Sequence, residues 1–312
     1  GNADVSAAGG YYAAGIGGGE YGSATNITIS GNATVKATGA AMGGAGIGGG
    51  EERKGVNIRI TDNADVTAYG GEDGAGIGGG RYCGGSVEIS GNAKVTAVGS
   101  NGGAGIGSGA DGGYSKKADT SVTISDNANV TAIGSYGGAA IGTGKGCTEG
   151  KTTINITGGT VTAIGGESTV RYVNGHCYKD LTSAIGGSHN YGGSDSVQDV
   201  TVTINGTTGN TTVNASCWLD QKSAISTGDG AADIIGYDED GKSPFGEDGS
   251  VIVRMYNHGS YTRTGYGPFS KSEGDLKSYN LGDLYQVVHN RKYMEEHPEI
   301  VDDINKLENS DL

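Results

Sequence analysis

Apolar residues recur along the chain in short groups, and the whole arrangement repeats about every 30 residues. Each repeat follows the pattern V-x-I-x-[GD]-N-A-x-V-x-A, then a glycine-rich stretch, then A-G-I-G. The isoleucine of the last element marks the repeats at Ile16, Ile47, Ile77, Ile106, Ile141, Ile185 and Ile225. Such a period is typical of a solenoid, in which each repeat buries its apolar face against its neighbours.

One repeat is enough to predict the course of one coil. Residues 87–89 alternate apolar and polar side chains, as a half-buried strand does. A Gly-Asn-Ala turn at residues 91–93 leads to a second strand at 95–97, and a glycine-rich loop leads to a third at 104–106. Three short strands per coil predict an all-β fold, a parallel β-helix. About seven coils, spaced about 4.8 Å apart, would form a rod roughly 35 Å long.

Equivalent positions of successive coils should form rows along the rod. The predicted core rows are Ile29, Ile60, Ile89, Ile124, Ile156 and Ile204; Val35, Val66, Val95, Val130, Val161 and Val213; and the isoleucines of A-G-I-G. A row of asparagines, Asn2, Asn32, Asn63, Asn92 and Asn127, occupies the turn. We interpret it as a structural amide ladder that supports a buried turn.

The repeat ends near residue 230, which divides the chain into a β-helix at 1–230 and a C-terminal cap at 231–312. Residues 231–270 are predicted to form irregular strands. From about Asp283 apolar residues recur at helical spacing (Leu284, Val287, Val288, Met294), and Pro298 begins a second predicted helix. A cap would cover the open strand edges of the last coil; the alternative is a linker to a further domain. Because the chain begins in the middle of a repeat, we expect a larger precursor with neighbouring domains.

Composition narrows the class of protein. Glycine accounts for 64 of 312 residues but proline for only 3, without a G-X-Y period, which excludes collagen. A net charge of −14 makes nucleic acid and anionic membranes poor partners. There is no apolar run of membrane-spanning length, so no membrane insertion is expected. Few cysteines and many Thr, Asn and Gly residues favour an extracellular, bacterial surface protein.

The segments Ile-Ser-Gly-Asn-Ala-Lys-Val-Thr-Ala-Val-Gly (89–99) and Gly-Ala-Gly-Ile-Gly-Gly-Gly (74–80) resemble the right-handed parallel β-helix repeats of large Gram-positive surface proteins. The resemblance covers about residues 1–230. It implies a pectate-lyase-like fold and, as in many such proteins, carbohydrate binding. It specifies the fold far more closely than the activity, because β-helices support lyases, hydrolases and adhesins alike.

Coils six and seven contain inserts that share the pattern C-[YW]-x-D-x-x-S-A-I. Stacking would place Tyr178 over Trp218 and Asp180 over Asp220. Aromatic faces bind the C–H surfaces of sugars, and carboxylates bind their hydroxyls. The candidate ligand-binding residues are therefore Tyr178, Trp218, Asp180 and Asp220, with Tyr172, His176, His189 and Tyr191 nearby in sequence. Alternatively, these aromatics cover the end of the core and the aspartates cap local turns.

Four cysteines fall into two pairs. Cys177 would stack over Cys217 at a strand spacing that a disulfide accepts, so we predict that they are bonded; the alternative is an unbonded, buried stack of the two thiols. Cys83 and Cys147 share a row but lie two coils apart, about 9–10 Å by the same spacing. Whether they pair is left open.

The favoured function is a non-catalytic extracellular β-helix that binds a polysaccharide or host glycan. The alternatives are a polysaccharide lyase or glycoside hydrolase of the same fold, and a structural stalk or protein-binding adhesin. Stacked aspartates could share a proton for acid–base chemistry, and Arg171 and Lys179 are the nearest bases.

No cofactor is expected. Residues 236–247 partly match a calcium-binding loop, but Asp240-Gly241 is also an ordinary hairpin turn, which we prefer. An outward row of Thr67, Thr96, Thr131 and Thr162 is reminiscent of ice-binding faces. The neighbouring outward row is chemically mixed, so β-propensity is the simpler explanation for these threonines.

Overall fold

The computed structural model describes residues 1–111, 118–147, 150–166, 169–173, 176–180, 182–188, 199–204, 211–216, 225–226, 233–235 and 260–264. Every regular element among these residues is a β-strand. Within the described ranges, no helix has the length and apolarity needed to cross a bilayer.

Three parallel sheets run along the molecule. Sheet A contains β1 (Asp4–Ala8), β5 (Thr34–Thr38), β8 (Asp65–Tyr69), β11 (Lys94–Val98), β14 (Asn129–Ile133), β17 (Gly159–Ile164), β22 (Thr211–Ser216) and β25 (Ser260–Thr264). Sheet B contains two-residue strands, β2 (Ile16–Gly17), β6 (Ile47–Gly48), β9 (Ile77–Gly78), β12 (Ile106–Gly107), β15 (Ile141–Gly142), β20 (Ile185–Gly186) and β23 (Ile225–Ser226). Sheet C contains β3 (Ala24–Thr25), β4 (Thr28–Ile29), β7 (Gly55–Ile60), β10 (Gly85–Ile89), β13 (Thr120–Ile124), β16 (Lys151–Ile156), β21 (Asp199–Ile204) and β24 (Asp233–Ile235).

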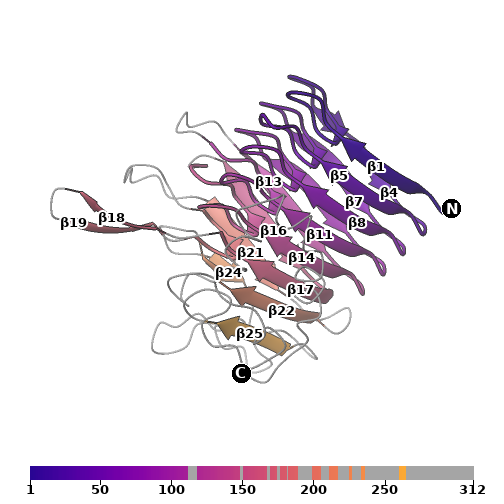
Figure 1. The fold of residues 1–312 in the computed structure, drawn as a ribbon. Coiled ribbons are helices and arrows are strands. Elements are labelled where there is room, and N and C mark those ends of the chain that lie inside the picture. The colour runs from indigo at the N-terminus through magenta and orange to yellow at the C-terminus, as the bar shows by residue number, and fades with distance from the viewer. Residues whose placement is uncertain are drawn as a thin grey trace, which may run out of the picture.

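The chain visits the three sheets in a constant order (Figure 1). Each coil adds one strand to each sheet, except that the first coil contributes both β3 and β4 to sheet C. Neighbouring strands within each sheet are parallel and come from consecutive coils. The predicted all-β parallel solenoid is therefore confirmed. The third strand of each coil is shorter than expected, because only the isoleucine and the residue after it form the ladder; that residue is a glycine in every strand of sheet B except β23.

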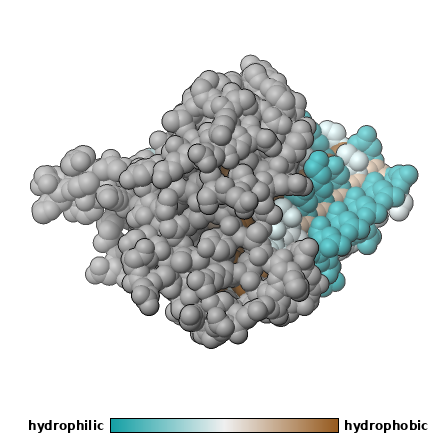
Figure 2. All heavy atoms as spheres, turned by 90° about the horizontal axis from the view of Figure 1, so that it is seen from below, coloured by the Kyte–Doolittle hydropathy of each residue, from teal (hydrophilic) through white to brown (hydrophobic). Residues whose placement is uncertain are grey.

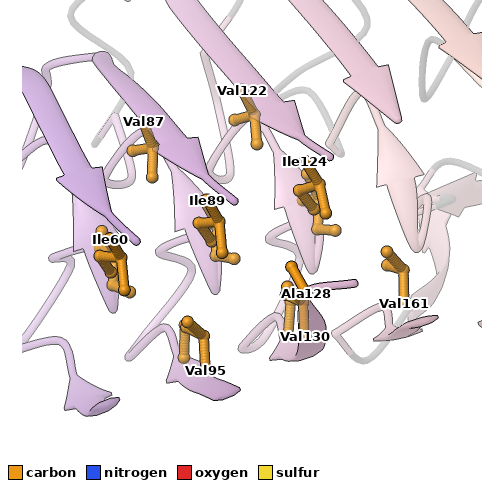
Figure 3. Packing of buried hydrophobic residues seen from close by; sticks show 14 of the residues in the cluster. Ile60, Val87, Ile89, Val95, Val122, Ile124, Ala128, Val130 and Val161 are labelled. Atoms are coloured by element: carbon orange, nitrogen blue, oxygen red, sulfur yellow. The ribbon is translucent and has the colours of Figure 1, made fainter. Parts of the chain in front are cut away.

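The predicted core rows are confirmed by the strand register. Ile89 pairs with Ile60 on one side and Ile124 on the other, and Val95 pairs with Val66 and Val130. Figure 3 shows the two rows facing one another across a narrow interior. Alanines such as Ala97 fill the space between them, and one hydrophobic cluster extends from Ile29 to Ala215. Each coil thus contributes a few small apolar side chains to a single continuous core.

The asparagine ladder is also confirmed, with one correction. The Asn32 amide donates to Asn2, and the Asn63 amide donates to Asn32, each at 3.0 Å; Asn92 and Asn127 continue the series. We expected a buried turn, but the ladder is exposed. The turn leaves the core and projects from the sheet corner, so the amides satisfy one another at the surface. Figure 2 shows bands of hydrophilic residues on the described part visible from below.

The threonine row has the expected register but not the expected exposure. Thr67, Thr96 and Thr131 are paired along the outer face of sheet A. Thr96 and Thr131 are only 5% and 1% exposed, and Thr162 is 5% exposed. The expectation of a solvent-facing threonine row is therefore wrong over these coils, and the row offers no open flat face to ice.

The sheets continue past residue 230. Strand β24 pairs with β21 and strand β25 pairs with β22, both in parallel. Ile234 therefore extends sheet C. The loop at 236–247, with the hairpin turn preferred at Asp240-Gly241, and the predicted helices after Asp283 lie outside the described residues.

Candidate functional site

Each coil presents two loops on the side of sheet B. The chain bends at the isoleucine of A-G-I-G, which points into the core. The residue two positions before the isoleucine donates its backbone N–H to the C=O of the residue two positions after the isoleucine. Examples are Ala75 to Gly79 at 3.1 Å and Ala104 to Ser108 at 3.0 Å. The sharp bend directs the preceding and following segments outward, side by side.

Loops of consecutive coils are joined by a second regular hydrogen bond. The donor is the backbone N–H of the residue four positions after the isoleucine of one coil. The acceptor is the C=O of the residue four positions before the isoleucine of the preceding coil. The pairs are Glu51 to Tyr12 (2.9 Å), Arg81 to Gly43 (2.7 Å), Ala110 to Asp73 (2.7 Å) and Lys145 to Gly102 (2.7 Å). We call the resulting surface the loop face. It contains residues 9–14, 39–44, 70–74, 99–103 and 134–138 before the isoleucines, and 18–23, 49–54, 79–84, 108–111 and 143–147 after them.

Exposed tyrosines are concentrated on the loop face. Tyr11, Tyr21 and Tyr136 are 70%, 53% and 36% exposed. Tyr11 also packs edge-on against Tyr12, with ring centroids 4.8 Å apart. The exposed aliphatic side chains Val5 and Val56, in contrast, lie on strands β1 and β7. The described surface thus presents its exposed aromatic area on one side of the solenoid.

Cations lie against these rings. The Lys145 Nζ is 3.7 Å from the centroid of the Tyr136 ring, and the Arg53 guanidinium is 5.7 Å from that of Tyr21. Arg53 is held in place because its Nε donates to the Tyr21 carbonyl at 2.7 Å. The aliphatic stem of Lys145 passes over Gly137 and Gly102, where a side chain would collide with it. Backbone and cation contacts therefore limit the movement of both tyrosines.

A partly buried carboxylate lies between the two ends of the loop face. Asp73 forms an ion pair with the Arg81 Nε at 3.1 Å and accepts a hydrogen bond from the Asn101 amide at 2.9 Å. Burial raises the pKa of Asp73, and Arg81 and the Asn101 hydrogen bond partly oppose the shift. At the N-terminal end, partial burial, Tyr11 and the Glu51 carboxylate raise the pKa of Tyr12. The Tyr12 hydroxyl therefore remains protonated at neutral pH and can donate a hydrogen bond.

The predicted site in coil six forms a hairpin. Strands β18 (Thr169–Val173) and β19 (His176–Asp180) pair antiparallel, with Tyr172 opposite Cys177. The hairpin is inserted between β17 and β20, in the position of the loop that precedes an isoleucine, and Figure 1 shows it projecting from the stack. The backbone thus brings Tyr172, His176, Tyr178 and Asp180 together on one insertion.

The remaining predicted site residues, Trp218, Asp220, His189 and Tyr191, lie outside the described residues. Cys217 does too, so the predicted disulfide between Cys177 and Cys217 stays a prediction.

The question left open for the other cysteines is answered. Neither Cys83 nor Cys147 forms a disulfide. Backbone of the coil between them intervenes, because the Cys147 thiol donates to the Gly109 carbonyl at 3.2 Å. Burial raises the pKa of Cys147 to about 12, with a smaller opposing effect from its contact with the Ser108 hydroxyl. Cys147 therefore remains a neutral thiol at neutral pH.

Among the described residues, no group of three or more His, Cys, Asp or Glu side chains is arranged to hold a metal ion. The chemistry that the described surface provides is that of aromatic rings, cations, carboxylates and amides. These are the groups that bind sugar rings and their hydroxyls.

Sequence reasoning missed the loop-face tyrosines, although a signal was present. Tyr11 and Tyr136 each precede the isoleucine of their coil by five residues, whereas Tyr21 and Tyr82 each follow it by five. Equal offsets in different coils place side chains in the same row. The glycine-rich loops that separate these residues concealed the relationship.

The fold and the repeat define a parallel β-helix, or β-solenoid, protein. Five segments of the chain match a family model described as a beta helix repeat, at residues 27–51, 58–81, 87–110, 122–145 and 154–189. Each matched segment runs from sheet C, through sheet A, to a strand of sheet B or the residues just after it. Comparisons with curated proteins and with solved structures gave no match to this chain.

Proposed function

We propose that the chain is an extracellular, non-catalytic β-solenoid that binds a glycan along its loop face. The observation that carries the proposal is the concentration of exposed tyrosines on this face. A cation lies against the ring of Tyr21 and another against the ring of Tyr136. Sugars bind to aromatic faces through their C–H surfaces, while neighbouring charged and amide groups hydrogen-bond to their hydroxyls.

The spacing of the tyrosines favours an elongated ligand. Tyr11 and Tyr21 belong to the first coil and Tyr136 to the fifth, which corresponds to about 19 Å along the axis at the usual strand spacing. The hairpin β18–β19 extends the same side of the solenoid at the sixth coil. A polysaccharide chain lying parallel to the axis would contact several coils at once.

A double substitution tests the proposal. Plant and mucin polysaccharides arrayed on a surface should bind the intact chain. Tyr21→Ala with Tyr136→Ala should weaken binding at least tenfold, about 1.4 kcal/mol, because aromatic anchors supply much of the energy of such sites. Val5→Ala with Val56→Ala is the matched control, since it removes exposed apolar side chains that lie off the loop face.

The same array separates the alternatives. If the tyrosine variant still binds and a Tyr178→Ala, Trp218→Ala variant does not, the binding site lies on the inserts of coils six and seven instead. Cleavage of a polysaccharide would establish a lyase or hydrolase. If no polysaccharide binds to the intact chain, a stalk or protein-binding adhesin takes the place of the proposal.

A further inference from the structure

The cations of the described loop face are all in contact with groups of the protein itself. These contacts are Arg53 to the Tyr21 and Glu52 carbonyls, Lys54 to the Asp119 carboxylate at 3.7 Å, Arg81 to the Asp73 carboxylate at 3.1 Å and Lys145 to the Tyr136 ring. The positive charges of this face are therefore already matched before any ligand arrives.

Two carboxylates of the loop face, in contrast, are exposed and unpaired. The side chains of Glu20 and Glu72 form no ion pair or hydrogen bond with any residue that the structure describes. Both residues are exposed to solvent. The charge that the loop face can offer to a ligand is therefore negative, in keeping with the net charge of −14 on the whole chain.

The unpaired carboxylates lie among the tyrosines. Glu72 precedes the isoleucine of its coil by five residues, as Tyr11 and Tyr136 do, so these three residues share one row. Glu72 belongs to the third coil, about 10 Å along the axis from either tyrosine at the usual strand spacing. Glu20 directly precedes Tyr21 in the first coil. A ligand that contacts the tyrosines would therefore also meet both carboxylates.

The ring of Tyr11 is open to a cation from outside. It is 70% exposed. Unlike Tyr21 and Tyr136, it has no Lys or Arg side chain of the described residues over its face. The neighbouring Gly10 has open space where a Cβ would lie. Aromatic faces attract ammonium groups, and carboxylates form charge-assisted hydrogen bonds with them.

Two neighbouring titratable groups lie within the field of these carboxylates. Partial burial is the largest cause of the raised pKa of Tyr12, and the Glu51 and Glu20 carboxylates raise it further. Burial likewise raises the pKa of Asp73, and the Glu72 carboxylate adds to that shift. A positively charged group placed beside Glu20 or Glu72 would be attracted by the same charges.

We propose that the ligand of the loop face is a polysaccharide of amino sugars whose amino groups are free and protonated. The Glu20 and Glu72 carboxylates pair with its ammonium groups, and the exposed tyrosines contact the C–H faces of its sugar rings. This inference rests on the proposed function, of which it names the class of ligand. Uronic acids and sulfated sugars are excluded by the same charges, because they would be repelled by Glu20 and Glu72.

Two oligosaccharides that differ at the amino group test the proposal with the full chain. Both are β-1,4-linked and of equal length; one consists of glucosamine and the other of N-acetylglucosamine. The buffer is mildly acidic, so that the free amino groups are protonated. Isothermal titration calorimetry should give at least about tenfold tighter binding for the glucosamine oligomer, because charge-assisted hydrogen bonds are stronger than neutral ones. Equal affinities for the two oligomers would overturn the proposal.

A pair of charge-matched variants locates the contact. Glu20→Gln with Glu72→Gln should weaken binding of the glucosamine oligomer at least about tenfold and leave binding of the acetylated oligomer unchanged. Asp4→Asn with Asp65→Asn is the matched control, since it removes the same charge from exposed positions on sheet A. The control should change the affinity less than about twofold, because distant surface charges are screened by salt. Equal losses in the two variants would mean general attraction to an acidic protein and would overturn the proposal.

The outcomes separate this inference from the proposed function. If the glucosamine oligomer is not preferred, but a neutral polysaccharide binds and is lost in the Tyr21→Ala, Tyr136→Ala variant, the amino-sugar inference is wrong and the proposed function stands. If neither oligomer nor any arrayed polysaccharide binds to the intact chain, both are wrong.

Discussion

Replacement of Gly107 by alanine is expected to destabilise the solenoid by about 3 kcal/mol or more. Gly107 has φ of +139°, a conformation that L-residues rarely adopt, and a Cβ there would lie under 3.0 Å from the backbone carbonyl of Gly142 in the next coil. The neighbouring backbone has no freedom to withdraw, because Gly107 and Gly142 are paired in the sheet B ladder. Denaturant unfolding followed by far-UV circular dichroism measures the loss.

Gly19→Ala is the control for this substitution. Gly19 also lies in a glycine-rich loop, but a Cβ there meets nothing within 4 Å. Its replacement should therefore change stability by no more than about 0.5 kcal/mol. Equal effects of the two substitutions would contradict the close stacking of coils at the A-G-I-G element.

Replacement of Ile106 by alanine should cost about 2–5 kcal/mol of unfolding free energy. Ile106 is 0% exposed and pairs with Ile77 and Ile141 in consecutive coils. Removing its side chain leaves a cavity that neighbouring coils cannot fill, since the short strands of sheet B are fixed on both sides by the backbone ladder.

Val56→Ala supplies the comparison, because Val56 is a strand residue of sheet C that is 39% exposed. Its replacement should cost well under about 1 kcal/mol. Comparable losses for I106A and V56A would mean that the isoleucine row is not the core of the solenoid.

The coils could be predicted because their determinants are local and repeated. An apolar side chain that recurs once in every coil, such as Ile60, Ile89 and Ile124, has to meet its equivalents when strands stack in register. The same reasoning identified the asparagine ladder. The structure also explains why Gly107 and the equivalent residues Gly48, Gly78 and Gly142 are glycines. A side chain at any of these positions would collide with the backbone of the next coil in sheet B.

Exposure was harder to predict than register. The outward position of Thr131 follows from strand alternation, but alternation does not predict that this side chain is only 1% exposed. The asparagine ladder was expected to support a buried turn, but the amides satisfy one another at the surface. Periodicity identifies which residues share an environment, but it does not reveal what that environment is.

The candidate site could not be predicted from the periodicity of the sequence either. The inserts of coils six and seven drew attention because they interrupt the repeat. Tyr21 and Tyr136 lie within it, on loops whose lengths vary from coil to coil. Only the hydrogen bonds that join neighbouring loops, such as Lys145 to Gly102, place these loops on one continuous surface. Such long-range contacts cannot be read from spacing alone.

Protection of individual tyrosines by a bound glycan tests the central claim most directly. The polysaccharide that binds best in the array is added at saturation, and iodination of each tyrosine is followed by mass spectrometry. Modification of Tyr11, Tyr21 and Tyr136 should slow in the presence of the glycan, whereas Tyr69, which is 6% exposed, should react slowly throughout. Unchanged rates at all three loop-face tyrosines under saturating glycan would contradict binding along the loop face.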